Sequence, residues 1–105
     1  MSTPYNDGQM IVSAPDTAAR VSNPFTSKPY EFFVVSADHL TGGETVNIQI
    51  RVGATLVQVL MPDMVTPATL TATLLGLALL GGPTYVFSKS ATASACGVYI
   101  DRWVP

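Results

Sequence analysis

Apolar and polar residues alternate along most of this chain, and the alternation predicts β-strands. The clearest example covers residues 44–52, where every second position is apolar: Val46, Ile48, Ile50 and Val52. Successive side chains of a strand point to opposite faces, so this pattern is typical of a strand with one buried face. Glycine-containing turns flank it, and the short connection Gly53-Ala54 predicts an antiparallel hairpin with a second strand over 55–61.

Other segments carry related signatures. Residues 31–36 contain a short run of aromatic and β-branched residues, which predicts a strand buried on both faces. Residues 84–88 and 96–103 are predicted to be further strands, and glycine or proline turns separate them. About seven or eight short strands of this kind predict an all-β fold, a small antiparallel β-sandwich of jelly-roll or immunoglobulin-like type. We assign this β-sandwich domain to residues 30–105.

Residues 68–80 allow two interpretations. Threonine alternates with leucine and alanine over 68–74, which is typical of a strand with one polar face. Leucine and alanine are also good helix formers, so a helix over this segment is the alternative. Gly76 lies in the middle of the Leu-rich part, 74–80, and favours a hairpin that turns near Leu75-Gly76.

Residues 1–29 differ from the remainder because they hold half of the eight prolines: Pro4, Pro15, Pro24 and Pro29. Proline removes a backbone donor, so we predict an extended N-terminal arm; a flexible tail is the alternative. Disordered tails rarely carry large apolar residues, and this segment carries several. The arm is therefore expected to lie on another surface. Together with a tryptophan near the other end, the predicted partner-interface residues are Tyr5, Met10, Ile11, Val12, Phe25 and Trp103.

Charge is scarce in this chain. Charged residues make up 11% of it, against about 25% in an average soluble domain, and a surface with few charges favours association. The five basic residues are scattered and the net charge is −2, so no basic footprint for nucleic acid or an anionic membrane is present. No apolar run approaches the roughly 20 residues that a membrane-spanning helix needs. The first residues do not resemble a signal peptide, so we expect a soluble protein made in the cytoplasm.

The residue inventory predicts no enzyme. The single histidine, His39, follows Asp38 in a polar loop, but no Gly-x-Ser-x-Gly elbow accompanies it, and a solvated loop histidine is the simpler interpretation. The carboxylates are unpaired in the sequence, and one histidine with one cysteine excludes the common zinc patterns. Cys96 is predicted to be an inert core thiol. We therefore predict no catalytic, cofactor-binding or metal-binding residues.

Three segments resemble a family of small virion proteins of tailed bacteriophages. Residues 43–50, Gly-Glu-Thr-Val-Asn-Ile-Gln-Ile, are similar to a recurrent strand opening of that family. Residues 68–73 are similar to its Thr-alternating strand, and residues 89–99, which run from Lys-Ser-Ala-Thr to Gly-Val-Tyr, resemble its C-terminal motif. The resemblance covers a little over half of the chain, and its motifs are structural.

The resemblance implies a capsid decoration, or cement, protein. Such a protein has no active site, binds the head surface where subunits of the major capsid protein meet, and stabilises the shell of the virion. A homotrimer on a threefold axis is the natural arrangement. The alternative is a β-sandwich module of a fibre, tail or neck that binds glycans or the host surface. In that case aromatic residues would form a stacking platform for sugars: Tyr30, Tyr85, Tyr99 and Trp103.

Overall fold

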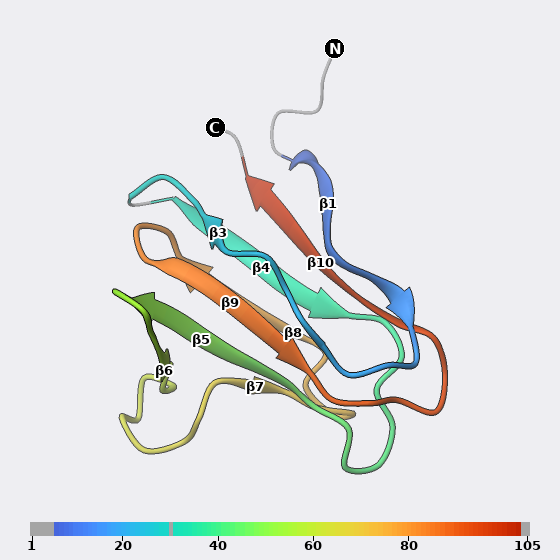
Figure 1. The fold of residues 1–105 in the computed structure, drawn as a ribbon. Coiled ribbons are helices and arrows are strands. Elements are labelled where there is room, and N and C mark those ends of the chain that lie inside the picture. The colour runs from blue at the N-terminus through green and yellow to red at the C-terminus, as the bar shows by residue number, and fades with distance from the viewer. Residues whose placement is uncertain (1–5, 30, 104–105) are drawn as a thin grey trace.

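Two antiparallel β-sheets pack face to face and form a β-sandwich (Figure 1). The computed structural model describes residues 6–29 and 31–103, with the side chains of residues 11–29 and 31–101, and these ranges contain no helix. The strands are β1 (Asn6–Asp16), β2 (Arg20–Val21), β3 (Phe25–Thr26), β4 (Phe32–Ala37), β5 (Val46–Val52), β6 (Thr55–Gln58), β7 (Thr69–Leu70), β8 (Gly76–Leu80), β9 (Thr84–Lys89) and β10 (Cys96–Trp103). The predicted all-β sandwich is confirmed.

The strands divide between the sheets in an order that differs from their order in the chain. Sheet A contains four strands in the order β1-β10-β4-β8. Sheet B is built around the pair β5 and β9, with β2 and β3 beside β9 and with β6 and β7 beside β5. Sheet A therefore ends at β1 on one side and at β8 on the other. This placement makes β8 an edge strand.

The core lies between the two sheets. Val46 and Ile48 of β5 are fully buried and Asn47 between them is exposed, so the predicted alternation is confirmed at the start of the strand. Val52 at its end is 55% exposed, so the predicted buried face does not extend along the whole strand. The hairpin through Gly53-Ala54 is confirmed as well, because Val52 pairs with Thr55. Cys96 is fully buried in the core, as predicted.

Aromatic rings join the two sheets at one end of the core. Phe33 of β4 makes edge-to-face contacts with Phe25 of β3, at a centroid distance of 5.2 Å, and with Tyr85 of β9, at 5.3 Å. Tyr85 also stacks on Phe87 with a centroid distance of 6.2 Å. Edge-to-face and offset pairs stabilise a core beyond the area that they bury.

From residue 6 onward, the segment predicted as an arm belongs to the sandwich. β1 pairs with β10, and β2 and β3 pair with β9. The prolines are compatible with this arrangement: Pro15 lies near the end of an edge strand, where a missing donor costs little, and Pro24 lies between β2 and β3. The short apolar segments between the prolines are therefore strands of the same domain.

Two predictions about single strands are wrong. β4 buries only one face, because Phe32 at its start is 61% exposed on the outer side of sheet A. The hairpin predicted near Leu75-Gly76 is also absent, as is a helix. The chain instead turns over residues 71–74, where the Thr71 hydroxyl accepts a hydrogen bond from Leu74 N–H (3.2 Å), and crosses from β7 in sheet B to β8 in sheet A.

Candidate functional site

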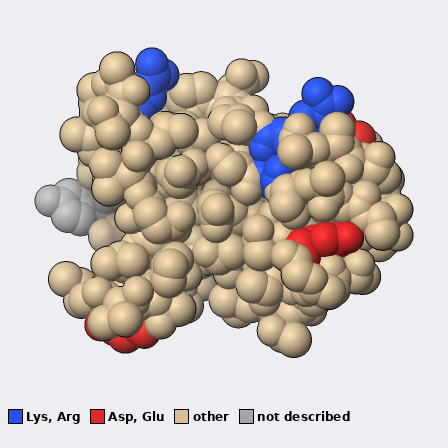
Figure 2. All heavy atoms as spheres, turned by 60° about the horizontal axis from the view of Figure 1, so that its bottom comes forward, with Lys and Arg blue, Asp and Glu red and all other residues tan. Residues whose placement is uncertain are grey.

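The longest uncharged part of the chain includes β8, the edge strand on the open side of sheet A. Residues 64–88 contain no aspartate, glutamate, lysine, arginine or histidine, and they fold into β7, β8 and most of β9. Charged side chains occupy only small parts of the surface that Figure 2 shows. Large apolar side chains are exposed on and around this side: Leu60, Met64, Val65, Leu74, Leu75 and Leu80. We call this set, with strand β8, the β8 surface.

No strand pairs with the backbone of β8 along its open edge. Ala37 N–H donates to the Leu75 carbonyl at 3.0 Å, which makes these two opposite residues a hydrogen-bonded pair. Bonded and non-bonded pairs alternate along an antiparallel ladder. In the register of β4 and β8, the backbone groups of Leu77 and Leu79 therefore point to β4. Those of Gly76, Ala78 and Leu80 point away, toward the open edge.

An apolar groove lies beside β8, with a volume of about 310 Å³. Leu77 and Leu79 of β8 form one wall, and the segment 59–64 forms the other. Tyr85 also lines it, and its hydroxyl donates a 2.7 Å hydrogen bond to the Leu80 carbonyl. Burial raises the pKa of Tyr85, so the phenol stays protonated and keeps this bond at neutral pH.

Gln58 holds the second wall of the groove in place. Its side-chain amide donates to the carbonyls of Ile48 (2.8 Å), Val59 (2.9 Å) and Ala68 (3.2 Å). Backbone bonds continue the connection, because Val59 N–H donates to Ile48 and Ala68 N–H donates to Val59. Hydrogen-bonded backbone therefore forms both walls of the groove.

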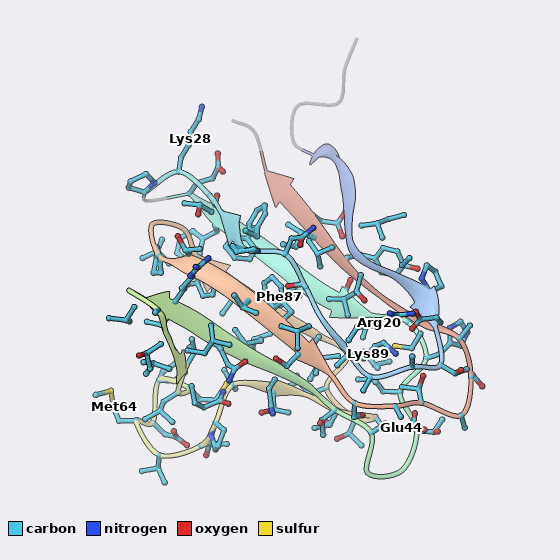
Figure 3. All side chains as sticks on the ribbon, in the orientation of Figure 1. Arg20, Lys28, Glu44, Met64, Phe87 and Lys89 are labelled. Carbon is cyan, nitrogen blue, oxygen red and sulfur yellow. The ribbon has the colours of Figure 1, made fainter. Side chains whose placement is uncertain are left out.

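A loop at the rim of the groove presents two apolar side chains to solvent. Met64 and Val65 are 76% and 77% exposed, and Met64 points away from the sandwich (Figure 3). Asp63 fixes the loop, because its carboxylate accepts hydrogen bonds from Val65 N–H (2.9 Å), Thr66 N–H (2.8 Å) and the Thr66 hydroxyl (2.5 Å). The Thr66 hydroxyl, then the Thr66 and Val65 amides, lower the pKa of Asp63.

The backbone of the same loop is strained at its tip. Met64 has a φ of +66°, in the left-handed region that side chains other than glycine rarely adopt. Its N–H donates to the Met61 carbonyl at 2.8 Å, and Met61 N–H donates to Thr66 at 2.7 Å. Strain of this kind, held by hydrogen bonds, clusters at binding sites. The loop is thus a preorganised apolar projection.

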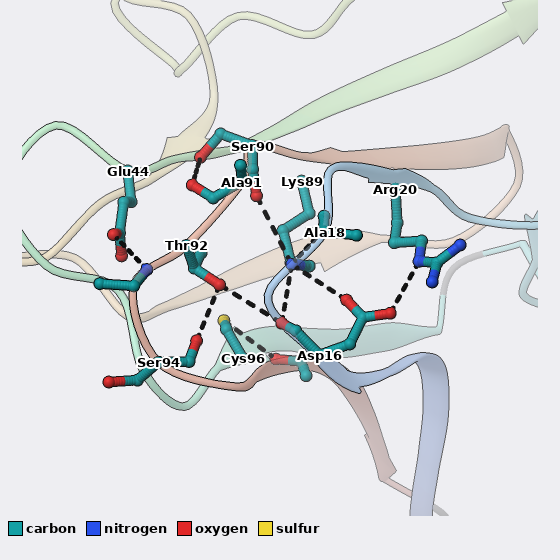
Figure 4. A network of polar contacts seen from close by, with 12 residues as sticks. Asp16, Ala18, Arg20, Glu44, Lys89, Ser90, Ala91, Thr92, Ser94 and Cys96 are labelled. Carbon is teal, nitrogen blue, oxygen red and sulfur yellow. Dashed lines mark hydrogen bonds and ion pairs between the residues drawn. The ribbon is translucent and has the colours of Figure 1, made fainter.

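Lys89 is the centre of the main buried polar network, and this network is structural (Figure 4). The side chain of Lys89 is fully buried, and its ammonium donates to the carbonyls of Ala18 (2.6 Å) and Asp16 (3.1 Å), with a longer contact to Ser90 (3.5 Å). It also lies 3.4 Å from the Asp16 carboxylate, which binds Arg20 Nε at 2.7 Å. These contacts tie the β1–β2 connection to β9.

Asp38 and His39 have a similar structural setting. Asp38 accepts hydrogen bonds from Gly97 N–H (2.8 Å) and the Tyr99 hydroxyl (3.0 Å), and His39 Nδ1 lies 3.3 Å from it. Partial burial raises the pKa of Asp38, but the contacts with Gly97, Tyr99 and His39 lower it by more, so the net pKa is below its usual value. The His39 side chain is 59% exposed in the loop, as the solvated interpretation expects.

The predicted partner residues whose side chains the structure describes do not form one site. Ile11 is 58% exposed on the outer face of sheet A, Val12 packs partly against the core, and Phe25 is buried in it. Phe25 is therefore not available to a partner in this fold. Tyr5 lies outside the described residues, and so do the side chains of Met10 and Trp103, whose backbones pair in β1 and β10.

The alternative sugar platform is not assembled by the described residues. Tyr85 is buried in the core and Tyr99 is hydrogen-bonded to Asp38 on sheet A. Tyr30 and the side chain of Trp103 lie outside the described residues. Sequence reasoning missed the β8 surface, although the signal was present in the absence of charge over 64–88.

No family model, no curated protein and no solved structure matches this chain. In residues 6–29 and 31–103, no group of three or more histidine, cysteine, aspartate or glutamate residues could hold a metal ion. The same ranges contain no helix of the length and hydrophobicity that crossing a bilayer requires. The prediction that the chain is not an enzyme stays a prediction.

Proposed function

We propose that this protein is a structural subunit that acts by binding other protein subunits through the β8 surface. The observation that carries the proposal is the exposed, uncharged edge strand with an apolar groove and a preorganised apolar loop beside it. Exposed apolar patches of this kind mark interaction sites, and an edge strand accepts an additional strand.

In its specific form, the proposal is a decoration protein that binds the major capsid protein on a tailed-phage head and stabilises the shell of the virion. This form rests on the three motifs that resemble small phage virion proteins, at residues 43–50, 68–73 and 89–99. The β-sandwich fold is compatible with this form of the proposal.

The energetics of the β8 surface suit this role. Burying a large apolar side chain contributes about 1.5–3 kcal/mol before ordering costs are subtracted. Asp63 already orders the loop that carries Met64 and Val65, so binding would lose little conformational entropy there. Many copies on one particle make individually weak contacts sufficient.

The test measures occupancy on heads that lack the protein. Purified protein is added to such heads, and bound protein is quantified after sedimentation together with the disruption temperature of the particles. The double variant Met64→Ser/Val65→Ser is expected to bind at least about tenfold more weakly, in line with the loss of two buried anchors. Val21→Ser is the matched control, because Val21 is 67% exposed on sheet B, away from the β8 surface.

Two results would contradict the proposal. Absence of binding by the unmodified protein removes the role on heads. Equal occupancy of the double variant and the Val21→Ser control removes the loop from the interface.

A further inference from the structure

We infer that the protein forms a two-fold dimer in which β8 of one copy pairs antiparallel with β8 of a second copy. The pairing joins the two four-stranded A sheets into one continuous sheet. The inference follows from the geometry of β8 itself and does not depend on the proposed role on phage heads. In the dimer the second copy occupies β8, so contact with a head would be made by the exposed loop of Met64 and Val65.

β8 is the unprotected edge of this sandwich. The opposite edge of sheet A, β1, carries Pro15, Asp16 and three register irregularities, which are features that discourage further pairing. In sheet B, β2, β3 and β7 have two residues each and β6 has four. β8 has no proline, no charge and no irregularity in its pairing with β4. It is therefore the edge in the described chain that is open to another strand.

One register satisfies the outward-pointing backbone groups of β8. A two-fold axis through Ala78 places Ala78 opposite its own copy and places Gly76 opposite Leu80 of the second copy. All three residues direct their N–H and C=O groups to the open edge, so each opposite pair becomes a hydrogen-bonded pair. The Leu80 carbonyl already accepts a bond from Tyr85, and its second lone pair remains for the partner strand.

The side chains fit the same register. On the outer face of sheet A, the large Leu80 meets a glycine of the second copy, and Ala78 meets an alanine. On the groove side, Leu77 lies opposite Leu79 of the second copy, so apolar side chains face one another. Phe32 is the cross-strand neighbour of Leu80 and extends the apolar stripe away from the axis.

Charge also favours a second copy as the occupant of this edge. Across a two-fold axis every residue near the axis approaches its own copy, so a charged residue there would meet a like charge. Residues 64–88 contain none, and they include all of β8 and the connections on both sides of it. Self-pairing therefore brings no like charges of β8 or its flanking connections together.

The test is a charge-complementation experiment on the full chain. Ala78 is exposed on the outer face, so Ala78→Glu and Ala78→Lys are each compatible with the fold but place like charges together at the axis. Sedimentation over a concentration series is expected to show a dimer for the unmodified protein. For each variant alone, the dissociation constant of the dimer is expected to rise at least about tenfold. An equimolar mixture of the two variants is expected to recover the dimer.

Two controls separate pairing from folding. Ala95→Glu and Ala95→Lys place the same charges at an exposed position before β10, and they are expected to leave the dimer unchanged alone or mixed. Ala78→Pro removes an N–H that points away from β4, so it is expected to abolish the dimer while the far-ultraviolet spectrum of the sandwich is retained.

Three results would overturn the inference: a monomer at all concentrations, a trimer, or a mixture of Ala78→Glu and Ala78→Lys that stays monomeric. A monomer that still binds heads would overturn the inference and leave the proposed function intact. A dimer that binds no heads would support the inference and contradict the proposed role on heads.

Discussion

Replacing Lys89 by methionine tests whether the buried ammonium stabilises this fold. Methionine keeps most of the volume of the lysine stem, so the substitution removes mainly the charge and its donors. The Ala18 carbonyl and the Asp16 carboxylate lose their contacts with Nζ at 2.6 and 3.4 Å. The Asp16 carbonyl keeps a second donor, because the Thr92 hydroxyl lies 3.3 Å from it.

The magnitude follows from these contacts. A hydrogen bond from a charged donor contributes about 1.5–3 kcal/mol, so losing the bonds to the Ala18 and Asp16 carbonyls costs about 3–6 kcal/mol. Removing the ammonium also removes its desolvation penalty, which offsets part of that cost. We expect the free energy of unfolding to fall by about 3 kcal/mol, a large fraction of the 5–15 kcal/mol typical of a domain.

Urea unfolding at neutral pH measures this change as a shift of the midpoint with an unchanged slope. Lys28→Met is the matched control, because Lys28 is exposed, and we expect it to change stability by less than about 0.5 kcal/mol. If Lys89→Met is as stable as the unmodified protein, the desolvation penalty equals the hydrogen-bond gain and the reasoning is refuted.

Three further predictions concern single residues. In Gly97→Ala the new Cβ would lie 2.5 Å from the Tyr99 hydroxyl oxygen, so we expect a loss of about 1–3 kcal/mol in urea unfolding, and a smaller loss in a Tyr99→Ala background. Phe33→Ala empties the centre of the aromatic cluster and should cost about 3–5 kcal/mol, measured by thermal unfolding; a cost below that of an exposed Phe32→Ala would contradict the packing. The lowered pKa of Asp38 contributes stability above its ordinary value of 3.8, and this stability is lost as pH falls through the lower folded value. Asp38→Asn should therefore flatten the dependence of stability on pH in that acidic range, and identical acid profiles would exclude this contribution.

The sequence by itself determined the local features of this protein. The alternation at 44–52 predicted β5 and the burial of Val46 and Ile48, and Gly53-Ala54 predicted the hairpin to β6. Both succeed because a period of two is a property of the extended backbone, and a two-residue turn leaves the next strand only one place to pair. The burial of Cys96 followed from its place in an apolar strand.

The tertiary structure alone decided which strands are neighbours and which edge is open. β1 pairs with β10 and β2 pairs with β9, so partners lie far apart in the chain and no local pattern encodes them. The same long-range pairing buried Phe25 and Lys89, residues whose neighbours along the chain gave no sign of it. In the sequence, β8 is an apolar segment, and an apolar segment is equally compatible with the centre and with the edge of a sheet. Only the crossing from sheet B to sheet A at residues 71–74 makes it an edge, because a backbone group is unpaired only when the fold places no strand beside it.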